Sequence, residues 1–319
     1  MKRLVALLSC ALPIAAFAQA FPSKPVRVVV PNPPGGVDVT LRLVQKDASE
    51  DLGQPIVFDY RPGANGFIGT EHVARSPADG YTLLATSPAS LVVGPAVTKN
   101  APFDALKDFT PVIALSGGVT VLVVRPTLGA SSLKEFVELA KAQPGKLTYG
   151  SGGIGTNNHL YAELVNVGAG ITTVHVPYKG SGPVIQALLS GEIDATYITV
   201  QSVRPLIASG KLKLLATFIG ERFPSLPATP DITEALPDFP LPPSWTGVLG
   251  PAGVPQAVVM RLHGAFLKAM NLPEVRAKFA EDTRILATTP QQFAAQLRAD
   301  VARANQIVSS VQRAGVKFE

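Results

Sequence analysis

The chain has 319 residues, 46% of them hydrophobic, and a formal net charge of +5 at pH 7. This length exceeds what one hydrophobic core usually covers, so we expect two lobes. Basic residues are scattered along the chain without a row of aromatic residues among them, which argues against a nucleic-acid-binding protein.

The first 18 residues have the pattern of a secretory signal peptide. Lys2 and Arg3 precede an apolar run over residues 4–17 that is too short to span a bilayer, and Ala16-Phe17-Ala18 has the form of a cleavage site. We predict cleavage near Ala18 and export to the bacterial periplasm. Cys10, the only cysteine, would leave with the signal, so the mature chain would have no disulfide. A faint lipoprotein-like pattern before Cys10 is the alternative.

Strand-like and helix-like segments alternate along the first half of the mature chain. Apolar runs predict strands over 26–30, 55–59 and 81–85, and helical spacing predicts helices over 38–52, 68–75 and 87–97. In the first of these helices Leu41, Val44, Ala48 and Leu52 share one side, and Gly53 suits the helix end.

The second half repeats this alternation. The predicted strands cover 119–124, 146–149, 173–176, 195–200 and 212–217, and the predicted helices cover 160–167, 182–189 and 203–209, with one more that begins at the capping-box pattern of Ser132 and Glu135. The proline-rich stretch 223–243 is interpreted as a connector, and the tail 255–316 as mainly helical, with 291–311 its longest amphipathic stretch. The pattern predicts an α/β protein with parallel sheets covered by helices.

The glycine-rich turn at 149–160 lies between a predicted strand and a predicted helix. Such a turn directs unpaired backbone N–H groups at one point, which favours an anion. Ser151 and Thr156 add hydroxyl donors, and Gly152 and Gly155 allow close backbone approach. An ordinary tight turn is the alternative, but the glycine density exceeds what one turn needs.

A second turn of this kind follows the first predicted strand. Pro34, Gly35 and Gly36 precede Asp38, whose side chain would cap the next helix. The alternative is a helix entry that proline makes rigid. Two such turns far apart in sequence suggest two lobes that close on one small carboxylate.

Serines and a histidine complete the candidate site. Ser87 and Ser90 follow the third predicted strand, where either could donate to a ligand and Ser87 could equally cap a helix. His159 lies on the first turn after the glycine-rich loop and is the one histidine whose position would let it line a pocket, with a purely structural histidine as the alternative. No pair of the four histidines has metal-ligand spacing, so we expect no metal.

Neither a cofactor motif nor a catalytic motif stands out. The phosphate-binding P-loop and the full dinucleotide-binding pattern are absent, so we expect no cofactor. Around Ser151 the nucleophile-elbow pattern fails, because Tyr149 stands where its first glycine should be. The sequence supplies donors and no evident general base, which favours holding a ligand over converting it.

Taken together, these motifs resemble the Bug-type periplasmic solute-binding receptors related to tripartite tricarboxylate transport. The resemblance covers most of the mature chain. It rests on the segments 31–38, 61–66 (Arg-Pro-Gly-Ala-Asn-Gly), 79–84, 149–160, 175–180 (His-Val-Pro-Tyr-Lys-Gly), 210–212, 245–247 and 251–255.

The resemblance implies a two-lobed type II periplasmic-binding-protein fold with a ligand cleft between the lobes. It implies a first lobe of residues 19–118 plus 244–319 and a second of residues 119–243. The ligand would be held by the loops at 33–38, 87–90 and 151–156, largely through backbone amides and bridging waters. The expected partners are a small organic carboxylate and membrane permease subunits, and we expect a monomer.

Two positions depart from the family pattern. Only Val37 separates Gly36 from Asp38, where relatives have two residues, and this shorter loop could shift one carboxylate contact. Some relatives have acidic residues where this chain has Ile198 and Thr199, so we predict a ligand without a cationic amine, such as an aromatic or aliphatic carboxylate. Thr199 is the candidate contact there.

Two other functions remain open. A sensory protein that presents ligand to a membrane kinase would use the same clamp as a transport receptor. A secreted hydrolase would use Ser151 or Ser87 as nucleophile.

Overall fold

The computed structural model describes residues 21–98 and 100–317. The predicted signal peptide, its cleavage near Ala18 and the lipoprotein alternative at Cys10 lie outside the described residues. Within the described ranges, no helix combines the length and apolar character needed to cross a membrane.

The first sheet has six strands in the order β11-β4-β10-β3-β1-β2. Three predicted strands are confirmed as the parallel strands β1 (Val26–Val30), β2 (Ile56–Tyr60) and β3 (Thr82–Thr86). The sequence analysis missed the three antiparallel additions, which are β4 (Phe109–Gly118), β10 (Thr246–Pro251) and β11 (Thr283–Ile285).

Helices cover both faces of this sheet. This is required because β1 has buried side chains on both of its faces. Val26, Val28 and Val30 enter one core and Val29 enters the other, because successive strand residues face opposite sides. The covering helices are α1 (Val37–Leu52), α2 (Phe67–Ala74), α9 (Gln256–Met270) and α10 (Pro273–Asp282). Between β3 and β4 lie a π-helical turn, η2 (Ala89–Val93), and the short α3 (Gly94–Val97), where a helix was predicted.

The second sheet has five strands in the order β7-β6-β8-β5-β9. Its strands are β5 (Thr120–Val124), β6 (Thr148–Ser151), β7 (Val174–Pro177), β8 (Ala195–Thr199) and β9 (Lys213–Thr217). Its helices are α4 (Leu133–Ala142), α5 (Asn157–Ala169), α6 (Ser181–Ser190) and α7 (Val200–Ala208). The predicted cap of α4 is confirmed, because Ser132 Oγ accepts from the Glu135 amide at 3.2 Å.

The prediction of parallel sheets is wrong for both sheets as wholes. In the second sheet β6, β7 and β8 are parallel, but β5 is antiparallel to β8 and β9. The reason is topological: β5 enters the second sheet directly from β4, so it runs opposite to the strands of the βα units. The connector is also more than a loop, since it contains α8 (Ile232–Ala235), capped by Asp231.

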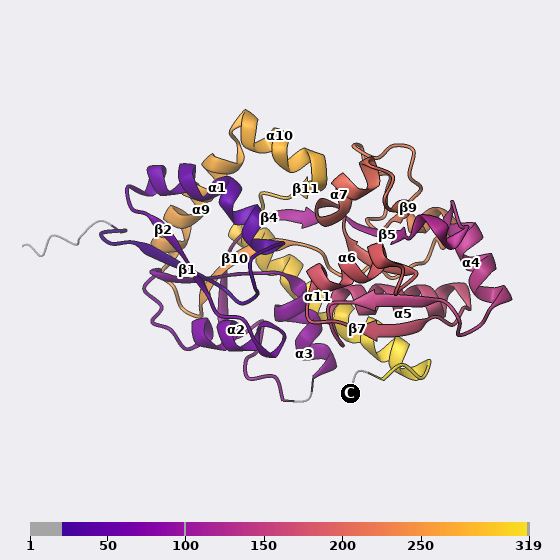
Figure 1. The fold of residues 1–319 in the computed structure, drawn as a ribbon. Helices are drawn as coiled ribbons and strands as arrows, with labels where there is room; N and C mark the ends of the chain where they lie inside the picture. Colours follow the sequence, from indigo (N-terminus) through magenta and orange to yellow (C-terminus); the bar gives the residue numbers. More distant parts are fainter. Residues whose placement is uncertain (1–20, 99, 318–319) are drawn as a thin grey trace, which may run out of the picture.

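Strand directions decide which sheet edges meet. β4 runs in the same direction as β3, since both are antiparallel to β10, and it passes through Val119 into β5. The carboxyl ends of β1, β2 and β3 therefore point toward the second sheet. β5 starts at this junction and is antiparallel to β8, so the carboxyl ends of β6, β7 and β8 point back toward the first sheet. Figure 1 shows the two sheets facing each other across the junction.

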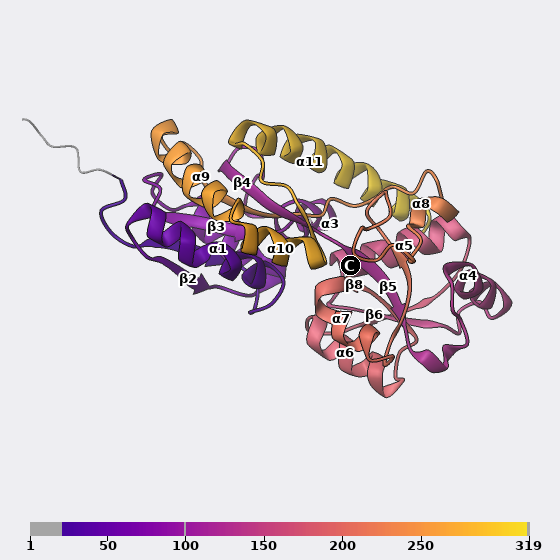
Figure 2. The same ribbon diagram turned by 90° about the horizontal axis from the view of Figure 1, so that it is seen from above.

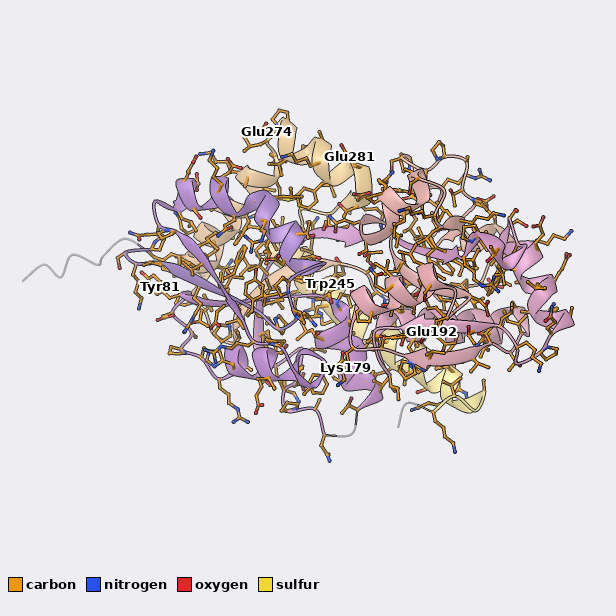
Figure 3. All side chains as sticks on the ribbon, viewed as in Figure 1. Tyr81, Lys179, Glu192, Trp245, Glu274 and Glu281 are labelled. Atoms are coloured by element: carbon orange, nitrogen blue, oxygen red, sulfur yellow. The ribbon has the colours of Figure 1, made fainter. Side chains whose placement is uncertain are left out.

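The last helix, α11 (Pro290–Arg313), runs along both sheets and packs on β4, α3 and α5 (Figure 2). The sequence predicted it as the longest amphipathic stretch. Near its middle Asp300 accepts a hydrogen bond from Trp245 Nε1 at 2.9 Å, and Trp245 lies where the chain returns to the first sheet (Figure 3). The expected lobe boundaries stay a prediction, and residues 244–319 include this bridging helix.

Candidate functional site

Every predicted site residue lies at the junction between the two sheets. Pro34, Gly35, Gly36 and Asp38 follow β1, Ser87 and Ser90 follow β3, Ser151, Gly152, Gly155, Thr156 and His159 follow β6, and Thr199 ends β8. These are carboxyl ends of strands, where open α/β sheets bind ligands. The lobes touch here, since a Cβ on Gly155 would lie 2.8 Å from Val97 Cγ2 of α3.

The 151–156 loop presents open amides toward the junction. Among the described residues, no acceptor is found for the amides of Gly152, Ile154, Asn157 or Asn158. The last two are first-turn amides of α5, which has no side-chain cap. The partial positive charge of a helix N-terminus adds to these donors, so the loop suits a carboxylate.

Three bonds fix the shape of this loop from within. Ser151 Oγ accepts from the Gly153 amide at 3.1 Å and lies 2.9 Å from the Gly153 carbonyl, and Thr156 Oγ1 donates to the same carbonyl at 2.7 Å. Ser151 is fully buried. The two hydroxyls expected to face a ligand thus shape the loop, and their contact with a ligand stays a prediction.

The loop after β1 has the backbone of an anion site. Gly35 has φ +139° and Gly36 has φ +30°, both in the left-handed region that favours glycine. Both glycines are exposed, and their amides have no acceptor among the described residues. A Cβ would meet nothing within 4 Å at either position, so conformation and not space demands glycine here.

The prediction that Asp38 caps α1 is wrong. The helix begins at Val37 with Gly36 as N-cap and no side-chain cap. Asp38 is buried and accepts hydrogen bonds from Tyr60 Oη and from Arg42 Nε, the latter at 3.1 Å. Asp38 is the second residue of the helix, and its carboxylate is directed to Tyr60 and Arg42 instead of to the backbone amides of the first turn. Arg42 partly compensates the charge of Asp38, which weakens the repulsion between this carboxylate and an anion at the junction.

The serines after β3 differ in burial. Ser87 is half-buried, whereas Ser90 is 1% exposed and its Oγ has no hydrogen-bond partner among the described residues. That oxygen lies 2.4 Å from where a Cβ on Gly66 would be, so only glycine fits there. A buried hydroxyl without a partner is costly, which suggests that a ligand or water completes it.

Two asparagines that the sequence analysis did not select share this property. Asn157 Oδ1 and Asn158 Nδ2 are buried atoms without a partner among the described residues, and both lie on the first turn of α5. Their signal in the sequence was their position directly after the glycine-rich loop. Ser90 and the two asparagines thus place unsatisfied hydrogen-bonding groups on both sides of the junction, Ser90 after β3 of the first sheet and the asparagines after β6 of the second.

Beneath the 151–156 loop lies a stack of aromatic rings. The ring centroids of His159 and His175 are 4.0 Å apart and nearly parallel, and Tyr149 stacks on His175 at 5.0 Å. His159 Nδ1 accepts from the Gly155 amide at 3.1 Å. Burial lowers the pKa of each histidine to about 4, so both rings are neutral at pH 7.

The contact between Ser151 Oγ and His175 Nε2, at 2.6 Å, is the one feature that resembles a hydrolase. A nucleophile must be reachable, and Ser151 is 0% exposed. Among the described residues, no carboxylate hydrogen-bonds His175 to orient it as a triad would require. This geometry favours a structural role for the pair.

The end of β8 offers a neutral polar group. Thr199 is exposed, and its Oγ1 lies 3.0 Å from Ser202 Oγ. Its neighbour Ile198 is buried in the apolar core of the second sheet. In the part of the chain that the structure describes, no group of three or more His, Cys, Asp or Glu side chains is placed to hold a metal ion.

Comparisons with known proteins agree with this arrangement. A family model described as tripartite tricarboxylate transporter family receptor matches residues 40–312. BugT of Bordetella pertussis is 35% identical over 292 residues, which cover 90% of this chain and 89% of BugT.

Two solved structures bear on the fold. An R. palustris protein solved with adipate has 30% identity and a TM-score of 0.86, and the match covers 92% of this chain and 98% of that one. MatC from Rhodopseudomonas palustris with bound malate has 28% identity and a TM-score of 0.82, with 90% and 100% covered. The two-lobed periplasmic-binding-protein fold is thus confirmed, and the chain belongs to the tripartite tricarboxylate transporter receptor family, a family of solute-binding receptors.

Proposed function

We propose that this receptor captures a small organic carboxylate between its lobes in the periplasm and delivers it to a tripartite tricarboxylate-type permease. The supporting observation is the pair of loops at 33–36 and 151–156, whose open amides lie at facing strand ends. Closure of the lobes would exclude water and strengthen these contacts. The structures of relatives with adipate and malate support the ligand class.

The ligand carries no cationic amine in this proposal. An ammonium group would need a carboxylate partner in the cleft. Asp38 is occupied by Arg42 and Tyr60, and β8 ends in Ile198 and Thr199 without an acidic group. A ligand with carboxylate and apolar or hydroxyl groups fits this charge distribution better than an amino acid.

Thermal-shift screening of the mature protein tests the proposal. The panel contains adipate, malate, benzoate and succinate, with aspartate as the amine-bearing match to succinate. A binder at about 100 times its dissociation constant adds about 2.7 kcal/mol, which raises the melting temperature by about 4 °C for a chain of this size. Tighter binding of aspartate than of succinate would overturn the amine prediction, and no shift with any acid would contradict the carboxylate class.

The transport and location parts need their own experiments. Fractionation of cells that express the full chain is expected to place it in the periplasm, shortened by about 18 residues. Co-purification with a multi-span permease supports transport, whereas capture of a membrane kinase would support the sensory alternative.

The Ser151–His175 contact keeps hydrolysis as a second candidate. Steady-state ester turnover that disappears in Ser151→Ala would favour it. We expect no turnover, because the hydroxyl is buried and shared with Gly153.

A further inference from the structure

His159 is buried beneath the 151–156 loop, and its ring closes that loop from below. Its Nδ1 accepts from the Gly155 amide at 3.1 Å, while its Nε2 lies 3.9 Å from Glu163 Oε1. A neutral ring whose Nδ1 accepts carries its proton on Nε2. The Gly155 bond therefore requires the neutral ring in one tautomer.

Gly155 has little freedom besides this bond. It is buried with φ +74°, and a Cβ there would clash with Val97 of the first lobe. The amide orientation of Gly155 sets the direction of the neighbouring open amides of Ile154 and the first turn of α5. A bond that fixes Gly155 thus adds to the three bonds that Ser151 and Thr156 make with Gly153, and it acts on the amides next to Gly155.

The surroundings of the ring hold it neutral. His175 of β7 stacks on it at 4.0 Å, and Tyr149 of β6 stacks on His175 at 5.0 Å with its ring centroid 6.3 Å from that of His159. Tyr197 of β8 packs edge-on against Tyr149, and α3 contributes the apolar Val97 to the loop. Tyr149 Oη donates to Glu163, the one carboxylate beside the rings among the described residues. Burial is the main cause of the lowered pKa of His159, and repulsion from a charged His175 lowers that pKa further.

The two histidines respond differently to acid. Ser151 Oγ can either donate to His175 Nε2 or accept from it, because the Gly153 carbonyl offers the hydroxyl a second acceptor. The Gly155 amide can only donate, so a proton on His159 Nδ1 eliminates that bond. Protonation of His159 thus removes a hydrogen bond of the loop, whereas protonation of His175 can keep its contact with Ser151.

We propose that His159 is a positioning residue: its neutral ring, stacked on His175, holds the Gly155 amide and so shapes the 151–156 loop for its ligand, and protonation of this ring weakens ligand binding. The inference rests on the proposed function of this loop. It assigns His159 a role beneath the binding surface instead of a contact with the ligand.

Amide NMR of the ligand-free protein tests the positioning role without any ligand. We expect the Gly155 amide signal to shift with the same midpoint as the His159 ring signals as the pH falls. In His159→Asn, whose Oδ1 replaces Nδ1 as acceptor but does not titrate, the Gly155 signal should stay constant. His72→Asn is the matched control, because His72 is also buried enough to have a lowered pKa but lies on α2 of the other sheet. A Gly155 signal that ignores the titration of His159 overturns the inference.

Binding of adipate and malate tests the consequence. At pH 7 His159→Leu is expected to bind about tenfold more weakly, since one constrained hydrogen bond is lost, and His159→Asn to stay within about threefold of the original protein. The affinity ratio of the original protein to His159→Asn should fall about twofold at the ring's titration midpoint and about fivefold one pH unit below it, toward a limit of about tenfold when the ring is fully protonated. The ratio is used because protonation of the ligand's own carboxylates at low pH weakens binding to both proteins equally and so cancels.

The two hypotheses fail in different ways. If no acid binds while Gly155 follows His159, the carboxylate function is wrong and the positioning role stands. If acids bind with the same pH dependence in His159→Asn, or if folded His159→Leu binds normally, the positioning role is wrong and the function stands. Circular dichroism of His159→Leu establishes that it is folded before this comparison.

Discussion

Buried polar atoms without partners mark the site at the scale of single residues. Among the described residues there are five such atoms: Ser90 Oγ, Asn157 Oδ1 and Asn158 Nδ2 lie at the junction of the two sheets, while His72 Nε2 lies on α2 and Arg284 Nε on β11. Folded proteins rarely leave these groups unfulfilled, because each costs about 1–3 kcal/mol. We therefore expect these side chains at the junction to lower the stability of the ligand-free protein and to hydrogen-bond a ligand or its bridging waters when the ligand binds.

Asn158→Ala tests this interpretation. Removal of an unfulfilled amide should leave the melting temperature of the free protein unchanged or raise it, while the shift produced by the best acid of the panel should fall by more than half. Differential scanning fluorimetry measures both quantities.

Asn166→Ala is the matched control, because Asn166 lies on the same helix as Asn158 but has a partner: its Oδ1 accepts from Thr173 Oγ1 at 2.8 Å. It should lower the melting temperature and keep the ligand shift. Equal behaviour of the two variants would contradict the assignment of Asn158 to the site.

At the scale of elements, one carboxylate ties the connector to the second sheet. Asp231 is 1% exposed and accepts from Thr217 Oγ1 at 3.0 Å and from the Ile219 amide at 2.9 Å, both at the end of β9. It also caps α8 through the Thr233 amide. The proline-rich stretch thus becomes a fixed crossing between lobes, which composition alone did not indicate.

Asp231→Ala should therefore be strongly destabilising. The change leaves several buried donors without an acceptor, so we expect a loss of about 3 kcal/mol or more in the free energy of unfolding by urea. Glu138→Ala on α4 serves as control, because the ion pair of Glu138 with Lys134 lies at an exposed site and its loss should have little effect on the free energy of unfolding. A loss below about 1 kcal/mol in Asp231→Ala would contradict this account.

At the scale of the whole molecule, the stacked histidines couple folding to pH. Their pKa values are about 4 in the folded protein and 6.5 when unperturbed, so the unfolded chain binds more protons between these values. Stability from the neutral pair is fully present above about pH 6.5 and decreases as the pH falls toward 4, by at most about 1.4 kcal/mol per pH unit for each histidine.

Urea unfolding at several pH values measures this slope. The double variant His159→Asn with His175→Gln should have a smaller slope between pH 6.5 and 4. The lowered pKa values of Asp51 and Asp104 lie below their usual 3.8, so these carboxylates act mainly below this window. An unchanged slope in the double variant would show that the pair is not the source.

The second expectation at this scale is that the two lobes close on the ligand. Gly117 and Gly118 end β4 at the crossing into β5, and a hydrophobic cluster that includes Leu84 and Tyr197 joins the two sheets. Because the two sheets share this core, we expect ligand binding to rotate one lobe slightly against the other, without a wide opening between the lobes in the free protein. Small-angle scattering should show a lower radius of gyration when the protein is saturated with a carboxylate ligand. Asn158→Ala, for which we expect weaker binding, should show no change at the same ligand concentration.

The sequence by itself determined the elements and the chemistry of the loops. Apolar periodicity predicted β1, β3, β5 and α11, because burial of one face imposes a local pattern. Glycine placement predicted both open-amide loops, since positive φ angles at Gly36 and Gly155 are a local demand of the backbone. These signals need only neighbours along the chain.

Only the tertiary structure decided pairing and partners. The antiparallel strands β4 and β10 were missed because their pairing partners are distant in sequence. Asp38 was predicted as a helix cap, but in the folded chain its carboxylate accepts from Tyr60 and Arg42 instead. The contacts of the Ser151 hydroxyl with His175 and Gly153 could not be read from the sequence, and its contact with a ligand stays a prediction. A hydrogen bond depends on which groups meet in space, and that is fixed only when the sheets have packed.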